Sequence, residues 1–242
     1  MPTPRFTRRR SVLLPAAMAL RLGQPDWAVA ARQVAASSML LVRGEARIPT
    51  GGEMAWRVVR DVAEVALAAV FERRALGFAV AAAPFSTLLL TDEATGSACR
   101  LAPGEAAFVR EGTFQRRESL GEGAQGYLRI GLVAAGSVND AGGDRLAFAG
   151  PPFALSPGPV TLTLLRVELA AGTPFALPPG GGATLVLVEQ GEVELEVGEA
   201  APRELLRTTV GSDTSYAVRS VASSAMLYGT RDATSVLIAA FA

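Results

Sequence analysis

The chain has 242 residues but no histidine and no lysine, so arginine supplies all 23 of its basic side chains. The missing histidine removes the commonest metal ligand in proteins and the side chain that titrates nearest neutral pH. Ser-His-Asp triads, histidine-based acid–base catalysis and histidine-containing metal sites are therefore excluded. No other feature of the composition limits the function of this protein as strongly.

Cysteine is nearly absent as well, because Cys99 is the only one. A single cysteine cannot form a disulfide within the chain. It is more often a small buried apolar residue than a nucleophile, and this chain has no histidine to activate a thiol. We therefore expect Cys99 to be buried and unreactive.

Charged residues are sparse, at 19% of the chain, whereas hydrophobic residues make up 50% and the mean hydropathy is +0.30. This composition is typical of a globular protein, and the length suits one large domain or two of about 100 residues. The weakly charged stretch 146–165 contains four prolines, whereas a membrane-spanning helix needs about 20 continuous apolar residues. We therefore predict that the mature chain has no transmembrane span.

The first 30 residues have the order of an export signal, with a basic region, an apolar region and a small-residue cleavage site. These parts are the arginines at 5, 8, 9 and 10, the stretch Ser11–Leu20 and the sequence Ala28-Val29-Ala30. The sequence Arg9-Arg10-Ser11-Val12-Leu13 resembles a twin-arginine signal, which predicts an extracytoplasmic or secreted protein cleaved after Ala30. A basic tail or an N-terminal helix on a cytoplasmic protein is the alternative.

Charge argues against a nucleic-acid partner. Removal of residues 1–30 takes away five arginines and one aspartate, which leaves 18 arginines against 22 acidic residues and a net charge of −4. A mildly acidic protein lacks the excess of basic groups that binds a phosphate backbone. We therefore predict no nucleic-acid binding.

From Met39 onward, short apolar runs alternate with Gly, Pro and Asp, which is typical of an all-β sandwich or barrel. The expected strands of the first half are 39–42, 46–48, 56–59, 76–81, 86–90, 106–109 and 127–133. Residues 61–74 are the exception, because their apolar side chains fall near helical spacing and favour one short helix. Residues 134–159 are rich in turn-forming residues and favour a linker.

The strand pattern resumes after the linker. The expected strands are 160–169, 184–188, 192–197, 204–209, 215–218 and 235–241. The clearest alternation is in 192–197, where glutamates alternate with Val193, Leu195 and Val197. The aliphatic residues are expected to face a core while the glutamates face water. We therefore assign these acids to a solvated strand face rather than to catalysis.

The stretch Gly172–Gly191 resembles the first conserved motif of the cupin superfamily, which runs Gly, five residues, His, one residue, His, three or four residues, Glu, six residues, Gly. On this frame Pro178 and Gly180 take the two histidine positions and Thr184 takes the glutamate position. None of these three side chains can hold a metal as the family's ligands do. The resemblance therefore implies a cupin-like barrel without its metal, and no cofactor is predicted.

A second cupin motif, which runs Gly, five residues, Pro, one, Gly, two, His, three, Asn, resembles the stretch Gly104–Ser119. Gly112 is present, while Arg110 takes the proline position and Gln115 the histidine position. A weaker match in the second half puts its proline, glycine and histidine positions on Ala217, Arg219 and Ala222. The resemblance implies an all-β chain of two tandem cupin-like double-stranded β-helix (jelly-roll) barrels, at 39–133 and 160–242.

The resemblance also implies which side chains enter the barrels. In the first barrel Gln115 points inward, and strand alternation sends Arg117 inward as well. Trp56 and Arg57 lie upstream, and together these four offer donors and an aromatic face for an anionic or carbohydrate-like ligand. The alternatives are that Trp56 belongs to the core, that Arg57 lies on the surface, and that Arg117 lies at the barrel mouth or faces outward.

Inward positions of the second barrel follow Thr184 and give Val186 and Val188, which predicts an interior filled by apolar side chains. Polar candidates therefore gather in the first barrel. The sequence favours a metal-free, non-enzymatic protein that binds an unidentified small molecule in or near the first barrel, with no catalytic residue assigned.

Two other functions stay open. A metal-independent enzyme, similar to the isomerases and epimerases that some cupin relatives resemble, would need Glu118, Glu111, Tyr127 or Tyr216 as its acid or base. A structural module is the third hypothesis, because cupin sheets often pair into homodimers and the high apolar content suits a buried interface.

Overall fold

The computed structural model describes residues 36–63, 69–72, 75–81, 87–111, 114–139, 145–178, 182–198, 202–207, 217–221, 224–231 and 233–242. The chain divides into a unit that ends at Gln33 and a unit that runs from Val34 to Ala242. All of the described residues belong to the second unit, and the predicted export signal lies outside them. Within the described ranges, no helix is long and apolar enough to cross a membrane.

The described residues of the first half form ten strands after β1 (Ser37–Ile48), with the 3-10 helix η1 (Ala135–Ser137) between β9 and β10. They are β2 (Gly52–Ala63), β3 (Ala69–Glu72), β4 (Leu76–Ala81), β5 (Leu88–Asp92), β6 (Ala98–Leu101), β7 (Ala106–Val109), β8 (Phe114–Ser119), β9 (Gln125–Ala134), β10 (Arg145–Ala149) and β11 (Phe153–Leu155).

The second half continues in the same way. Its described strands are β12 (Gly158–Leu169), β13 (Pro174–Ala176), β14 (Thr184–Gln190), β15 (Glu192–Val197), β16 (Glu204–Arg207), β17 (Ala217–Val221), β18 (Ala225–Gly229) and β19 (Thr234–Phe241). The bounds of β4, β7 and β15 coincide with the predicted strands, because β4 and β7 are short apolar runs and β15 alternates between glutamate and aliphatic residues.

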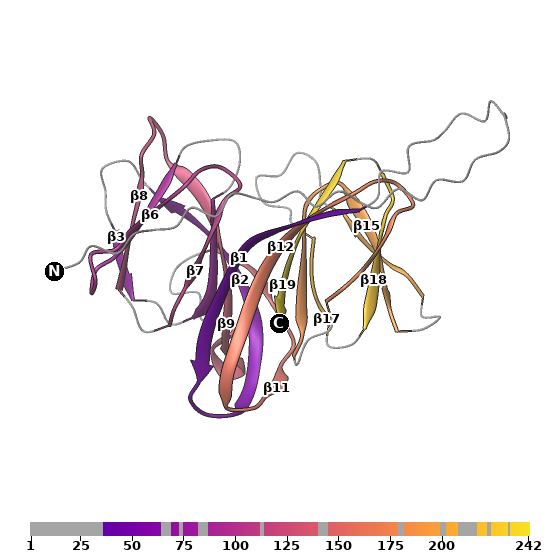
Figure 1. Cartoon of the computed structure of the whole chain (residues 1–242), viewed down its shortest axis with the longest axis horizontal. Helices are drawn as coiled ribbons and strands as arrows, with labels where there is room; N and C mark the ends of the chain where they lie inside the picture. The colour runs from indigo at the N-terminus through magenta and orange to yellow at the C-terminus, as the bar shows by residue number, and fades with distance from the viewer. Residues whose placement is uncertain are drawn as a thin grey trace, which may run out of the picture. The chain divides into compact units, whose positions relative to one another are not determined.

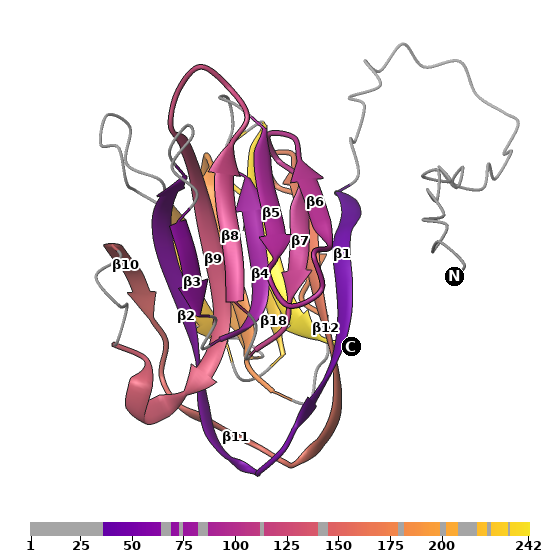
Figure 2. The same ribbon diagram turned by 90° about the vertical axis from the view of Figure 1, so that its left-hand side faces the viewer.

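Each half builds a barrel from two antiparallel sheets (Figures 1 and 2). The first barrel consists of the sheet β10-β2-β9-β4-β7, with β11 added on β2, and the sheet β3-β8-β5-β6. The second barrel consists of the sheet β1-β12-β19-β14-β17 and the sheet β13-β18-β15-β16. The predicted all-β fold of two tandem jelly-roll barrels is confirmed.

Strand β1 does not belong to the barrel in which the predicted domain boundaries put it. It precedes the first barrel in sequence, but it pairs along its length with β12 and so forms the edge of the second barrel's larger sheet. It also packs on the first barrel, since a Cβ added at Gly44 would overlap the ring of Phe108 on β7. Sequence order alone does not reveal such an exchange, because β1 and β2 are joined by a short turn that looks like an ordinary hairpin.

Two local predictions in the first half are wrong. Residues 61–63 and 69–72 of the predicted helix are extended, in β2 and β3; the rest of that segment lies outside the described residues. The side chains of residues 61–63 alternate across β2, so Ala63 is buried while Val62 is exposed. Residues 134–159, expected to be a linker, contribute β10 and β11, which pair with β2 at a sheet edge where flanking prolines are tolerated.

Three groups of buried apolar residues hold this unit together. The largest lies between the β2-containing sheet and the β1-containing sheet and includes Trp56, Phe78, Leu185 and Leu237. The second lies inside the second barrel and the third inside the first barrel. Because the larger sheets bury both faces, their central strands are apolar on both sides.

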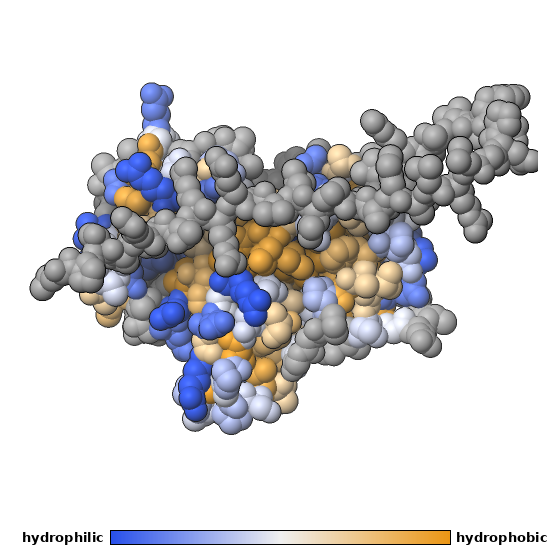
Figure 3. Space-filling model, in the orientation of Figure 1, coloured by the Kyte–Doolittle hydropathy of each residue, from blue (hydrophilic) through white to orange (hydrophobic). Residues whose placement is uncertain are grey.

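Apolar side chains also reach the surface at one edge. Figure 3 shows hydrophobic residues gathered on the face that carries β1 and β12. At the start of β1, Met39 is 52% exposed and Leu40 is 54% exposed. Single exposed apolar residues of this kind are common in globular proteins and do not by themselves mark an interface.

Candidate functional site inside the first barrel

Strand alternation brings polar side chains into the first barrel from both of its sheets. On β2, residues 57 and 61 share the inner face, and on β9 the inner face carries residues 127 and 129. Register places Asp61 directly opposite Tyr127. From the facing sheet, β8 sends Arg117 across the interior to meet both. Three strands that are distant in sequence therefore meet at one point.

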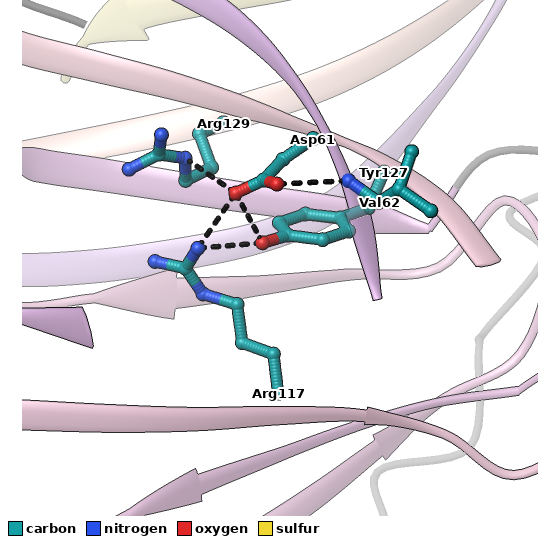
Figure 4. Close-up of polar contacts among 5 residues, drawn as sticks. All are labelled: Asp61, Val62, Arg117, Tyr127 and Arg129. Atoms are coloured by element: carbon teal, nitrogen blue, oxygen red, sulfur yellow. Dashed lines mark hydrogen bonds and ion pairs between the residues drawn. The ribbon is translucent and has the colours of Figure 1, made fainter. Parts of the chain in front are cut away.

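The carboxylate of Asp61 is the centre of this cluster (Figure 4). Its Oδ2 atom accepts hydrogen bonds from Arg117 Nη1 at 2.8 Å and from the Tyr127 hydroxyl at 2.5 Å, and Arg129 Nε lies 3.5 Å away. Its Oδ1 atom accepts the backbone N–H of Val62 at 2.8 Å. Arg117 Nη1 also donates to the Tyr127 oxygen at 2.5 Å. Charge-assisted bonds of this kind are the strong ones in proteins.

The two sides of the cluster differ in exposure. The Arg117 side chain is only 1% exposed, whereas Asp61 is 11% exposed and Arg129 is 16% exposed. Arg57 lies nearby on β2, is buried, and donates through Nη1 to the carbonyl oxygen of Ser137 at 3.2 Å. Arg129 is the most exposed of these three side chains, but its Nε and Nη2 atoms are themselves buried.

Burial and like charge shift the pKa values of two members. Burial raises the pKa of Tyr127 far above its ordinary value, and Asp61 adds to this while Arg117 opposes it. Burial lowers the pKa of Arg129, and the positive charges of Arg117 and Arg57 lower it further while Asp61 opposes them. The phenol thus stays protonated as a donor, and the guanidinium of Arg129 stands among like charges.

The structure unites three of the four predicted site residues on the inner face of the first barrel. Gln115, Arg117 and Arg57 are all buried there. Trp56 is on the other face of β2, where its indole N–H donates to the carbonyl of Ala183 at 2.5 Å and its ring packs on Phe241. Trp56 is therefore part of the core between the sheets, as the alternative interpretation had it.

Sequence reasoning missed Asp61 and Arg129 as site residues and named Tyr127 only as a candidate acid for an enzyme. The signal that was missed is the alternation of side chains along β2, which puts Arg57 and Asp61 on the same face. The helix predicted at 61–74 hid this alternation. Cys99 was also misjudged, since it is exposed rather than buried. Its strand β6 is at the edge of the smaller sheet, where one face is open.

No family model and no curated protein matches the sequence. Among solved structures, the chain is similar to the salicylate 1,2-dioxygenase from Pseudaminobacter salicylatoxidans, with 11% identity, a TM-score of 0.50, and coverage of 77% of this chain and 70% of that one. It is similar to the conserved protein of unknown function PA5104 from Pseudomonas aeruginosa PAO1, with 12% identity, a TM-score of 0.50, and coverage of 85% and 98%.

A cupin 2 conserved barrel domain protein from Leptotrichia buccalis is also similar, with 10% identity, a TM-score of 0.43, and coverage of 85% of this chain and 92% of that one. This chain has the cupin fold. Identities this low establish the architecture and leave the chemistry of each cupin to its own residues.

The residues of this chain do not fit the transition metal that the fold family implies. The inward-facing motif positions hold Gln115 in the first barrel and Thr184 in the second, both buried. Gly180 and Ala222 lie outside the described residues, and Pro178 offers no donor atom. Within the ranges that the structure describes, no three His, Cys, Asp or Glu side chains come together as metal ligands. Such sites need several N, O or S donors at fixed geometry.

The second cupin barrel has a different interior. Most of its buried residues are aliphatic, and Val186, Val188, Val193, Leu195 and Leu227 are all fully buried. The buried polar side chains described there, Thr184 and Thr234, are uncharged. The predicted inward orientation of Val186 and Val188 is therefore correct, because Leu185 and Leu187 between them face the core shared by the two larger sheets. This interior is a packed core.

Proposed function

We propose that this cupin is a metal-free, non-enzymatic binding protein that holds a small anionic molecule in its first barrel. The observation that carries the proposal is the polar cluster, in which the guanidinium groups of Arg57, Arg117 and Arg129 and the carboxylate of Asp61 share one barrel interior in the described part of the chain. Guanidinium groups in a shielded site bind anions well.

Side-chain size supports the same barrel. Residues that point inward from the larger sheet of the first barrel include Ala63, Ala79, Ala81 and Ala107. The second barrel has Val167, Val186, Val236 and other branched residues at inward positions. Small side chains leave more of the first interior to be filled by the long arginines and by a ligand.

The candidate acid and base residues support an enzyme less well than the arginine cluster supports a binding protein. Tyr127 has a proton to give, but its hydroxyl already donates to Asp61, whose two oxygens accept three bonds in all. Glu111 is exposed, and Glu118 lies between the inward-facing Arg117 and Ser119, so it faces away from the interior. Tyr216 lies outside the described residues. General acid–base catalysis needs a positioned pair, which these groups do not form.

Thermal-shift screening of the purified protein against small anions tests the proposal, with elemental analysis of the dialysed protein beside it. We expect stabilisation by at least one anion and no stoichiometric Mn, Fe, Ni or Zn. Gln115→Leu should leave folding nearly intact and weaken binding, because it removes a polar group from the inner face at similar volume. One equivalent of a transition metal bound in a barrel would overturn the metal-free assignment.

The structural-module alternative predicts a homodimer that binds no small molecule. Packing between the two larger sheets already buries, within one chain, the faces that a sheet-to-sheet dimer would use. A native mass measurement beside the ligand screen separates the two functions: a stable dimer without any ligand response supports the module and contradicts the binding protein.

We also propose that the protein is exported, on the strength of the arginine cluster, the apolar run and the sequence Ala28-Val29-Ala30. Terminal sequencing of protein from the native host should find a chain that begins at Ala31. Replacement of Arg9 and Arg10 by lysine should block export if the twin-arginine route is used. An intact Met1 on a cytoplasmic protein would remove the export proposal.

A further inference from the structure

We propose that strand β1 is an interaction surface for a second copy of this chain, and that two copies pair antiparallel along their β1 edges about a two-fold axis at Gly44. Such pairing extends the larger sheet of the second barrel across both molecules. It leaves the interiors of the barrels untouched, so it does not depend on the proposed ligand site. A dimer of this kind is compatible with anion binding in each copy.

The free edge of β1 is long. The strand has 12 residues, and among the described strands it pairs with β12 alone. The described lengths of the other edge strands are three to five residues; these strands are β3, β6, β7, β10, β13, β16 and β17. Natural proteins usually keep edge strands short, because a row of unpaired N–H and C=O groups binds another strand. Among the described edges, β1 is the exception to this rule.

The first barrel covers one face of β1 rather than its edge. A Cβ atom added at Gly44 would overlap the ring of Phe108 on β7, and Cβ atoms point out of the plane of a sheet. Val42 and Ala46 pack into the same core between the larger sheets. The hydrogen-bonding groups at the free edge lie in the plane of the sheet, at right angles to this contact. In Figure 2, β1 runs along the right-hand side of the strands. Pairing at the edge therefore keeps the contact with Phe108.

The charged side chains of β1 face uncharged residues on β12. Arg43 and Glu45 are exposed and flank Gly44, so they lie on the face of the sheet that is turned away from the first barrel. In the ladder, Arg43 is opposite Thr163 and Glu45 is opposite Thr161. Opposite charges at directly opposed positions stabilise an antiparallel pair of strands. A strand on the free edge of β1 stabilises it most if it offers an acid to Arg43 and a base to Glu45.

Two-fold symmetry restricts the register of such a pair. Directly opposed side chains in an antiparallel ladder lie on the same face, so the axis between two copies of one strand must pass through a residue that opposes itself. With the axis at Gly44, Arg43 of each copy opposes Glu45 of the other, and Val42 opposes Ala46. Two reciprocal ion pairs form, and Gly44 puts no side chain at the centre. The sequence of β1 is therefore complementary to itself in this register.

The registers one residue away place like charges together. With the axis at Glu45, the two copies of Glu45 oppose each other and Arg43 opposes Arg47. With the axis at Arg43, the two copies of Arg43 oppose each other. Like charges at directly opposed positions destabilise a strand pair. Charge therefore excludes both neighbouring registers.

A register with the axis at Ala46 also pairs opposite charges, because Glu45 then opposes Arg47. Since β1 ends at Ile48, this register joins only the last part of the strand, whereas the axis at Gly44 joins most of it. A longer ladder satisfies more backbone groups and buries more surface. The axis at Gly44 is therefore the favoured one.

Charge reversal tests the pairing, with sedimentation equilibrium of the purified protein over a concentration series as the measurement. We expect a monomer–dimer equilibrium. Arg43→Glu puts two carboxylates into each of the two ion pairs and should raise the dissociation constant of the dimer about 10- to 100-fold. Glu45→Arg should weaken the dimer to a similar extent, because each pair then contains two guanidinium groups.

A mixture of the two reversed variants is the most specific arm. One chain then carries two acids at positions 43 and 45, and the other carries two bases, so a heterodimer regains both attractive pairs in the Gly44 register. Native mass spectrometry should find this heterodimer although each variant alone is largely monomeric. A variant that fails to fold cannot produce that result, and thermal melting of each variant confirms its folding. If both variants are monomeric alone and the mixture gives no heterodimer, the proposed pairing is wrong.

Arg47→Glu is the matched control, because in the Gly44 register Arg47 opposes Leu41 and has no charged residue directly across the interface. This variant should not weaken the dimer. If it does so while Arg43→Glu does not, the register is wrong and the axis lies at Ala46. A chain that stays monomeric at millimolar concentration, or a dimer that responds to none of the three reversals, would show that β1 does not join two copies.

Discussion

The two barrels share one architecture but fill it differently. Around the second barrel's axis, branched aliphatic side chains such as Val186, Leu195 and Leu227 form a closed core. Around the first, alanines and a few leucines share the interior with arginine, aspartate and tyrosine. A barrel whose only task is stability is best filled with apolar side chains, since each buried polar group must find a partner. The first barrel therefore departs from what folding alone requires.

Removal of Asp61 from the polar interior of the first barrel should have the largest effect on the free energy of unfolding. Asp61→Ala leaves Arg117 buried without the carboxylate that it binds, and breaking a buried ion pair costs about 3–5 kcal/mol. The free energy of unfolding, measured by urea titration, should fall by that amount. Glu93→Ala breaks the exposed pair with Arg116 and should cost less than about 1 kcal/mol. Equal losses of unfolding free energy in the two variants would mean that the buried Asp61–Arg117 pair stabilises the fold no more than a surface ion pair does.

Added volume should be tolerated in one barrel and not in the other. Ala240 faces the packed interior of the second barrel, so Ala240→Val should lower the free energy of unfolding by about 1–3 kcal/mol. Ala79 lies beside Arg129 in the first barrel. Ala79→Val should cost less than about 1 kcal/mol and should weaken ligand binding. Urea titration of both variants checks this, and a larger loss for Ala79→Val would mean that the first barrel is the tighter one.

High pH should destabilise the protein through Tyr127. Burial raises the pKa of its phenol above the ordinary value of 10.0, so the unfolded state loses this proton first as the pH rises. The unfolded state then binds fewer protons than the folded state, and stability falls above pH 10 by up to about 1.4 kcal/mol per pH unit. Unfolding titrations between pH 9 and 11 should show this slope, and Tyr127→Phe should remove most of it. An unchanged slope in the variant would contradict the assignment.

The sequence predicted the barrels well because their strands carry local signals. Apolar runs mark β4 and β7, alternation between glycines marks β15, and the cupin-like glycine frames indicated the tandem order. Pairing partners carry no such signal, and this is why β1 was assigned to the wrong barrel and β10 was taken for a linker. Which distant strands pair depends on the packing of the whole protein rather than on the sequence of one strand.

The candidate site was predicted on the smaller sheet of the first barrel, whereas on the larger sheet only Arg57 of its charged residues was named. Gln115 and Arg117 follow from the second cupin motif, so their inward orientation was accessible from sequence. Asp61 and Arg129 lie on strands that resemble no motif, and only the register between β2 and β9 brings them together. Trp56 was assigned to the ligand because its direction depends on the parity of β2, which a single residue cannot reveal.

A crystal structure grown with 4-bromobenzoate tests the central claim most directly, because the anomalous signal of bromine locates the ligand without reference to its shape. We predict one strong bromine peak inside the first barrel, with the carboxylate among the arginine side chains of its interior, and no peak inside the second barrel. A bromine peak in the second barrel, or peaks confined to the protein surface, would contradict the account.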